Sequence, residues 1–144
     1  MKINLIAVGS LNKETKILFK DYVKKLSFYA ELRISEVKPI LDKNIEIIKQ
    51  KETKIIKSLI NKNSRVILCS LNGETMTSKK FSEKYSNIDN LTFIIGGSYG
   101  VEETQFNEKI CFSKMTFPHQ LFRVFLVEQL FRAHSIKNNS KYHK

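Results

Sequence analysis

The chain has 144 residues, of which 42% are hydrophobic and 27% are charged, and its formal net charge is +11. These values fit one domain that buries its own core, and they exclude a chain that depends on disulfides to fold. The positive charge favours a polyanionic partner, because each Lys or Arg that meets a phosphate releases a counterion. One alternative stays open, namely lysines that only solvate an Ile-rich helix: Lys43, Lys49, Lys51, Lys54, Lys57 and Lys62.

The first half of the chain alternates between predicted strands and helices. Lys2–Val8 is an apolar, β-branched run closed by Gly9, which predicts a buried strand. Lys13–Leu26 places apolar residues at helical spacing, and Leu32–Val37 predicts a second strand. Ile45–Ile60 carries isoleucines and leucines on one predicted side and charges elsewhere, which indicates an amphipathic helix.

The second half continues this alternation. Its predicted elements are a strand at Arg65–Leu71 broken by Asn72-Gly73, a helix at Ser78–Tyr85, a strand at Leu91–Ile95, a short helix or turn at Val101–Asn107, a strand at Ile110–Phe112 and a long helix at Gln120–His134. A polar tail follows from residue 138 to residue 144. This order predicts a single α/β domain over residues 1–144, with a mostly parallel sheet and helices on both faces.

The cysteines and the N-terminus indicate the compartment. Cys69 and Cys111 lie in apolar runs, where a free cysteine usually behaves as a small buried hydrophobe. No Cys/His cluster has the spacing of zinc ligands, so no metal is expected. The first ten residues lack the features of a signal peptide, and no run is long enough to cross a bilayer. The expectation is a cytoplasmic protein with no membrane partner.

A glycine-rich loop, Gly96-Gly97-Ser98-Tyr99-Gly100, follows the predicted strand Leu91–Ile95. Glycine lacks a Cβ, so the backbone there can approach a ligand closely or adopt a positive φ. Ligands of open α/β sheets bind at the carboxyl ends of strands. The spacing matches neither the dinucleotide fingerprint nor the P-loop. The loop indicates a ligand site or, alternatively, a tight turn.

The segment FSKMTFPHQ, residues 112–120, places Phe112, Met115 and Phe117 between a strand and a helix. These side chains either fill the core or contact an apolar ligand or a partner subunit. The helix Gln120–His134 that follows is apolar nearly all round. One of its faces can pack on the sheet, and the other favours a second copy of the chain.

The chain ends in Tyr142-His143-Lys144, after a polar stretch. Chain ends of this kind are often disordered and without a role. An aromatic residue beside basic residues can also stack on a base and contact a phosphate. We expect these three residues to serve RNA and to be mobile without it.

Several segments occur together in one order: INLIAVG, VILCSLNG, IIGGSYG, FSKMTFPHQ, RVFLVEQLFRA and the terminal YHK. With this combination the chain, from Met1 to Lys144, resembles the large-subunit ribosomal RNA methyltransferase H family, a minimal group of SPOUT methyltransferases. The resemblance implies a deep trefoil knot in the C-terminal half, a homodimer, and S-adenosylmethionine bound in the knot loops. The residue pattern by itself does not predict the knot, since true knots are rare.

The resemblance also implies which residues bind the cofactor. They come from the end of the third strand, the glycine loop and the segment after the last strand: Cys69, Gly96, Gly97, Gly100, Phe112, Ser113, Lys114, Met115, Thr116 and Phe117. Many family members have leucine in place of Cys69, so a main-chain or apolar contact is expected there. Some have Pro-Glu in place of Ser98-Tyr99, which leaves no side-chain role assigned at those two positions.

The family's substrate is a pseudouridine of large-subunit ribosomal RNA, which is methylated at ring N3. That nitrogen must lose a proton to attack the methyl group, so a base or a nearby cation would help. The candidate residues are His119, Arg123, Tyr142, His143 and Lys144. Two alternatives remain, a non-catalytic RNA-binding or ribosome-associated protein of the same fold and a SPOUT enzyme that acts on tRNA. DNA is not expected as a partner.

Overall fold

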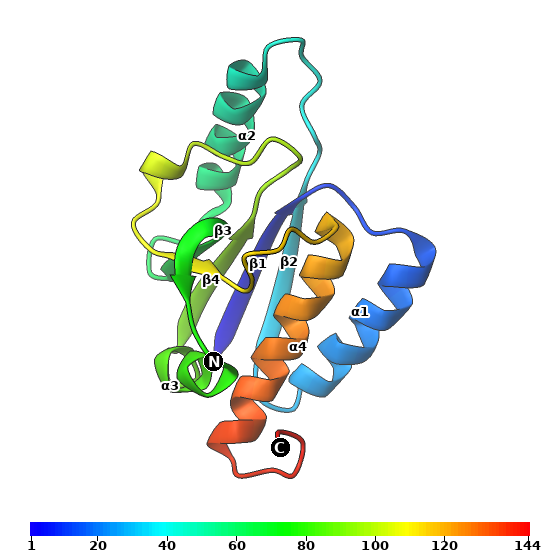
Figure 1. Ribbon diagram of the computed structural model, residues 1–144, viewed down its shortest axis with the longest axis vertical. Coiled ribbons are helices and arrows are strands. Elements are labelled where there is room, and N and C mark those ends of the chain that lie inside the picture. The colour runs from blue at the N-terminus through cyan, green and yellow to red at the C-terminus, as the bar shows by residue number, and fades with distance from the viewer.

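Five parallel strands form the central sheet of the computed structural model, which describes residues 1–144. The strands are β1 (Lys2–Val8), β2 (Glu31–Val37), β3 (Arg65–Thr75), β4 (Asn90–Ile95) and β5 (Lys109–Cys111). Their spatial order is β2-β1-β4-β3-β5, and every neighbouring pair is parallel. The carboxyl ends of β1, β2 and β4 point toward the top of Figure 1. The predicted α/β class with a parallel sheet is confirmed.

Three helices connect strands, and a fourth follows the last strand. They are α1 (Lys13–Leu26), α2 (Ile45–Leu59), α3 (Ser78–Tyr85) and α4 (His119–Lys137), and a 3-10 turn lies at Glu103–Gln105. The first three begin where the side chains of Asn12, Asn44 and Thr77 accept a hydrogen bond from a first-turn N–H. The first and last residues of each helix differ from the predicted ones by at most three positions. No helix combines the length and apolar character that crossing a membrane requires.

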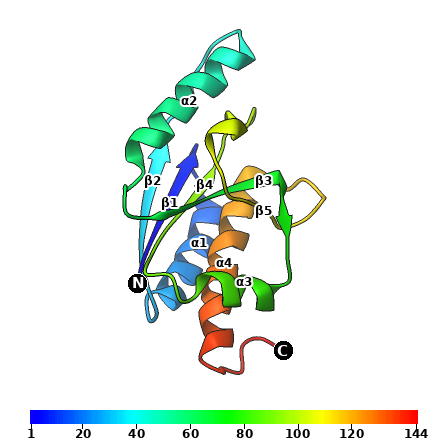
Figure 2. The ribbon, with the colours of Figure 1, turned by 90° about the vertical axis from the view of Figure 1, so that its left-hand side faces the viewer.

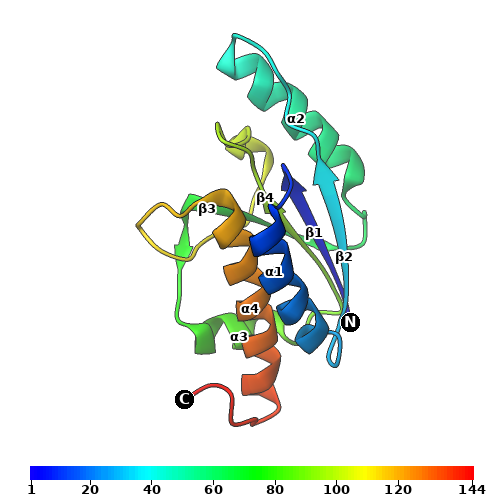
Figure 3. The same cartoon turned by 90° about the vertical axis from the view of Figure 1, so that its right-hand side faces the viewer.

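Helices cover both faces of the sheet, as predicted (Figures 2 and 3). Because side chains alternate along a strand, Ile3, Leu5 and Ala7 of β1 point into a larger core that α1, α3 and α4 close. Ile6 and Val8 point to the opposite face, where they belong to a smaller core that α2 covers. Helices α1 and α4 lie side by side on the first face, and α2 extends past the end of the sheet on the other.

The buried side of α2 differs from the predicted apolar stripe. Its buried residues are Ile48, Glu52, Thr53 and Ile56. Three other apolar residues are largely exposed, namely Ile45, Ile55 and Leu59. A polar pair therefore replaces aliphatic side chains in the middle of the buried side, where α2 meets the loops at the carboxyl ends of the strands.

The backbones of β3 and β5 come into direct contact at Gly73. Ile110 of β5 pairs with Cys69 and again with Glu74, so the intervening residues of β3 bulge. A Cβ placed on Gly73 would lie 2.4 Å from the carbonyl carbon of Ile110. The chain remains extended through Gly73 to Thr75, so the prediction of a strand break at Asn72-Gly73 is wrong. Glycine is required here because its lack of a side chain allows the two backbones to touch.

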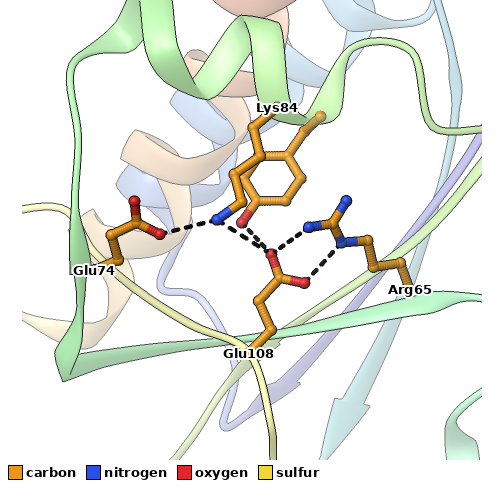
Figure 4. A network of polar contacts seen from close by, with 5 residues as sticks. Arg65, Glu74, Lys84 and Glu108 are labelled. Atoms are coloured by element: carbon orange, nitrogen blue, oxygen red, sulfur yellow. Dashed lines mark hydrogen bonds and ion pairs between the residues drawn. The ribbon is translucent and has the colours of Figure 1, made fainter.

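Charged side chains fasten the start of β5 to β3 and α3 (Figure 4). Glu108 accepts hydrogen bonds from Arg65 at 2.7 and 3.0 Å and from the Tyr85 hydroxyl at 2.7 Å. The Lys84 ammonium lies 2.9 Å from Glu74 and 3.6 Å from Glu108. Burial would raise the pKa of Glu108, but the hydrogen bonds from Arg65 and Tyr85 outweigh it and lower that pKa. The resulting carboxylate anchors an edge strand of only three residues.

We expect Gly73→Ala to destabilise the fold by at least about 2 kcal/mol, because the added methyl group meets backbone atoms that cannot rotate away. The matched control is Thr75→Ala, an exposed position two residues later in the same strand, which should cost less than about 1 kcal/mol. Urea unfolding followed by circular dichroism measures both. Equal midpoints for the two variants would contradict the close crossing.

Candidate functional site

A pocket of about 580 Å³ opens beside the middle of β3 and the carboxyl end of β4. The middle of β3, the glycine loop and the segment after β5 form its walls. Nine of the ten residues predicted to bind a cofactor line it, namely Cys69, Gly96, Gly97, Gly100, Phe112, Ser113, Met115, Thr116 and Phe117. The tenth, Lys114, is exposed and does not line the pocket. The fold therefore brings together three segments that are far apart in the sequence.

The glycine loop is packed closely against its own neighbours. A Cβ on Gly96 would lie 3.1 Å from a methyl carbon of Val101, and one on Gly97 would lie 3.0 Å from Oε1 of Glu52. Gly100 has a φ of +76° and donates its N–H to the Gly97 carbonyl at 3.0 Å, which closes a tight turn. A side chain at Gly96 would thus displace the loop itself, which in turn lines the pocket.

Aromatic residues support the wall formed by residues 112–117. Phe112 packs against Phe122 of α4 with ring centroids 5.0 Å apart, and Phe117 packs edge-on against Phe125 at 5.3 Å. Met115 is 75% exposed. The two phenylalanines are therefore half-buried parts of the pocket wall, whereas Met115 is free to contact a ligand or another chain.

Glu103 supplies a polar group that sequence reasoning missed. It lines the pocket and accepts hydrogen bonds from the Ser70 hydroxyl at 2.8 Å and from the Asn72 amide at 3.3 Å. An acidic residue in a short polar turn has no distinguishing sequence signal. Cys69, on the same side of the pocket, has its pKa raised by burial, so its thiol stays protonated and behaves as an apolar group.

His119 also lines the pocket, at the first residue of α4. Its ring lies beside Gly9, and Nε2 is buried with no hydrogen-bond partner. Burial lowers the pKa of His119, the positive charge of Arg123 lowers it further, and the Glu36 carboxylate opposes both. The imidazole is therefore neutral near pH 7, so one of its ring nitrogens can accept a hydrogen bond or a proton.

Arg123, a second predicted catalytic residue, does not reach the pocket. Its side chain is only 1% exposed and donates to the Glu36 carboxylate and to the Gly9 carbonyl. The guanidinium thus fixes the start of α4 to the carboxyl ends of β1 and β2. A group held in this way can act on a substrate only through its neighbour His119.

The three C-terminal residues lie at the opposite end of α4 (Figure 1). The Tyr142 hydroxyl donates to Glu128 at 3.0 Å, its ring packs edge-on against Phe131, and the Arg132 guanidinium lies over it. Burial and the Glu128 contact raise the pKa of Tyr142 to about 12. His143 contacts Arg132 at 3.1 Å, and Lys144 is exposed. The expectation of an unanchored tail is wrong for Tyr142, which packs on the helix.

Comparison with known proteins gives consistent results over the whole chain. A family model described as "Predicted SPOUT methyltransferase" matches residues 1–143. The chain is 57% identical to a protein of Mycoplasma mobile and 43% identical to one of Clostridium perfringens, in each case over 100% of both chains. The first is named "Ribosomal RNA large subunit methyltransferase H" and the second "Ribosomal RNA large subunit methyltransferase H 1".

Two solved structures have a similar fold. One is described as a candidate RNA methyltransferase of Bacillus anthracis, with a TM-score of 0.56, 11% identity and 99% of each chain covered. The other is described as a structure that bears on 2-OH methylation of C/U34 on tRNA, with a TM-score of 0.54, 10% identity, and 96% of this chain and 97% of that chain covered. At these identities the likeness concerns the fold alone.

Proposed function

Because the chain belongs to the SPOUT methyltransferase family, we propose that it transfers a methyl group from S-adenosylmethionine to large-subunit ribosomal RNA. The observation that carries this proposal is the pocket in which the glycine loop meets residues 112–117. Its volume of about 580 Å³ falls within the range of about 300–1,000 Å³ that is typical of small-molecule sites. The names of the relatives support the choice of RNA over a small acceptor.

The residues of the pocket fit the proposed cofactor. Gly96 and Gly97 place loop backbone in the pocket wall, and Phe112 and Phe117 offer apolar surface to a flat ring. Glu103 can accept hydrogen bonds from hydroxyl or ammonium groups. The bound cofactor would supply a methyl group already activated on a sulfonium, and no cluster of three or more metal-ligating side chains occurs in the chain.

His119 is the proposed residue for proton transfer in this pocket. Its neutral ring has a buried, unpartnered Nε2, and Arg123 and Glu36 hold the turn from which it projects. The family's target is N3 of a pseudouridine, which must lose a proton before it can attack a methyl group. A neutral imidazole at the pocket can accept that proton or orient the base by a hydrogen bond.

A homodimer through α4 is part of the proposal. Leu121 and Phe125 of α4 are 40% and 39% exposed, whereas Leu126 faces the protein's own core and is fully buried. The exposed apolar surface is therefore one face of the helix, continuous with Phe117 through its contact with Phe125. A second copy of the chain is the economical cover for such a face.

An antiparallel dimer would also give the C-terminal residues a role. Helix α4 has 19 residues and is about 28 Å long. Tyr142 packs on Glu128, Phe131 and Arg132, which lie from the middle of the helix onward, whereas the pocket lies at its start. In an antiparallel arrangement the tail of one protomer approaches the pocket of its partner. Tyr142, His143 and Lys144 are then proposed to complete the substrate site in trans.

The deep trefoil knot belongs to the proposal as well. Family membership supports it, and so does the backbone crossing of Gly73 and Ile110. That crossing places β5, and with it residues 112–117, against the bulge of β3. The pocket walls would then be loops of the knot.

The direct test is methyl transfer from labelled S-adenosylmethionine to ribosomes, 50S subunits and naked ribosomal RNA, followed by nucleoside analysis. The wild-type protein should label a pseudouridine of the large-subunit RNA. Gly96→Val should lose at least tenfold in cofactor affinity by calorimetry, because its side chain displaces the loop that lines the pocket. Tyr99→Ala, in the exposed part of the same loop, is the control and should bind normally.

Cofactor binding without methyl transfer to any RNA would favour the non-catalytic alternative. Labelling of tRNA alone would favour the second alternative. Unchanged cofactor affinity of the Gly96→Val variant would contradict the proposal that the cofactor binds in this pocket.

We expect Phe125→Asp to turn the dimer into folded monomers, since a charge at the centre of an apolar interface is costly. Sedimentation at micromolar concentration measures the mass, and circular dichroism verifies the fold. Ile55→Asp, at an equally exposed apolar position on α2, is the control and should remain dimeric. Leu126→Asp would not be informative, because that side chain is buried within the monomer. A monomeric wild-type protein would refute the interface.

We expect deletion of Tyr142, His143 and Lys144 to lower methyl transfer about tenfold or more, since stacking on an aromatic ring contributes about 1–3 kcal/mol per base. Cofactor affinity and dimerisation should be unchanged. Lys141→Ala, just before the deleted residues, is the control for charge near the chain end. Full activity of the shortened protein would show that the tail has no role in methyl transfer. Reduced cofactor affinity would show that the tail helps to bind the cofactor instead of the RNA.

A further inference from the structure

Helix α2 carries lysines that form no ion pair with any acidic side chain. Among its four lysines, Lys51, Lys54 and Lys57 are exposed, and none of the four takes part in an ion pair. Of its two glutamates, Glu52 is buried and accepts the Ile40 N–H, so it does not offset the charge of this surface directly. The charge is thus available to a partner outside the protein.

These three lysines form one wall of a groove of about 530 Å³. Gln50 adds to this wall, and Glu102 and Gln105 form the other. The Glu102 carboxylate is partly engaged, since it accepts a hydrogen bond from the Gln105 amide at 2.8 Å. No apolar residue lines the groove, so it lacks the buried aromatic or aliphatic anchors on which a protein partner depends.

The groove and the pocket share a single loop. The loop lines the pocket on one side with Gly96, Gly97, Ser98, Gly100, Val101 and Glu103, and it lines the groove on the other side with Glu102 and Gln105. The loop is fixed to α2 because the Glu102 N–H donates to the buried Thr53 hydroxyl at 3.0 Å. A ligand that occupies the groove therefore lies beside the pocket at a fixed position.

We propose that this groove, defined by Lys51, Lys54, Lys57 and Gln105, binds backbone phosphates of the RNA that flank the target nucleotide. The inference rests on the proposed function and adds the surface that holds the substrate. Ammonium groups spaced along one helix face contact successive phosphates without reading the sequence. The Gln105 amide donates one N–H to Glu102 and has a second N–H for a phosphate, and the adjacent pocket receives the base.

The test is the triple variant Lys51→Gln, Lys54→Gln and Lys57→Gln. Its matched control is Lys13→Gln, Lys16→Gln and Lys20→Gln, which removes the same charge from three exposed lysines of α1 on the opposite face. Affinity for naked large-subunit ribosomal RNA is measured between 50 and 200 mM salt by fluorescence anisotropy. Methyl transfer to ribosomal particles is measured in parallel, and cofactor affinity is measured by calorimetry.

We expect the α2 variant to bind RNA at least roughly tenfold more weakly and to lose about two to three units from the slope of log affinity against log salt. The α1 control should keep the wild-type slope, and both variants should bind cofactor normally. An unchanged slope in the α2 variant overturns the proposal. So does reduced methyl transfer to particles with unchanged binding to naked RNA, which would indicate a ribosomal protein instead.

Failure of the proposed function gives a different pattern. If the protein is not an RNA methyltransferase, the wild type itself transfers no methyl group to RNA. The methyl-transfer assay then cannot distinguish the α2 variant from the α1 control. RNA affinity and its salt slope remain measurable in that case, so the groove is still tested.

Discussion

The contact between the backbones of Gly73 and Ile110 is the constraint on which the site depends. β5 has only three residues and sits at the edge of the sheet, so few ladder hydrogen bonds hold it. Its position comes from the bulge of β3, which touches Ile110 directly, and from Glu108, which joins Arg65, Lys84 and Tyr85. The segment that leaves β5 is thereby directed past the middle of β3 and the carboxyl end of β4, where it becomes a wall of the pocket.

The pocket contains few charged side chains. Its lining residues include no Lys or Arg, and Glu103 is the only carboxylate among them. Burial keeps the Cys69 thiol protonated, and burial together with Arg123 keeps His119 neutral. A cofactor with a positive sulfonium would be repelled by cations in this space. The lysines that give the chain its net charge lie instead on outer helix surfaces such as that of α2.

The sequence predicted local structure well, since it depends on patterns within a few residues. The bounds of β1, α1 and α3 agree with the predicted ranges, because apolar spacing and capping residues such as Asn12 and Thr77 act locally. The end of β3 was predicted wrongly because Asn-Gly is also a common turn signal. What keeps Gly73 extended is a contact with β5, which is distant in the chain and leaves no local pattern.

The site was predictable in part. The family resemblance named nine residues that line one pocket, and residue types alone indicated little beyond a glycine-rich turn. Glu103 was missed because nothing in its surroundings marks it, and the buried position of Glu52 was missed because a carboxylate among isoleucines was assigned to the solvent side. The sequence of α4 is apolar on both faces, so it does not indicate which face packs in the core and which is exposed. The folded structure was required to distinguish them.

Helix α2 connects the pocket, which has few charges, to the surface that carries the lysines. Its buried Glu52 and Thr53 contact the β2–α2 loop and the loop at Gly97–Glu102, and its exposed lysines face outward from the same turns. A buried carboxylate is costly unless its oxygens are partnered, and Oε1 of Glu52 has no partner in a position against Gly97. This oxygen lies against the loop, so any side chain at Gly97 would contact it, and position 97 is restricted to glycine. The helix that carries the cations is thus tied to the loop that forms the pocket, so the position of a bound phosphate backbone and the shape of the pocket depend on the same few contacts.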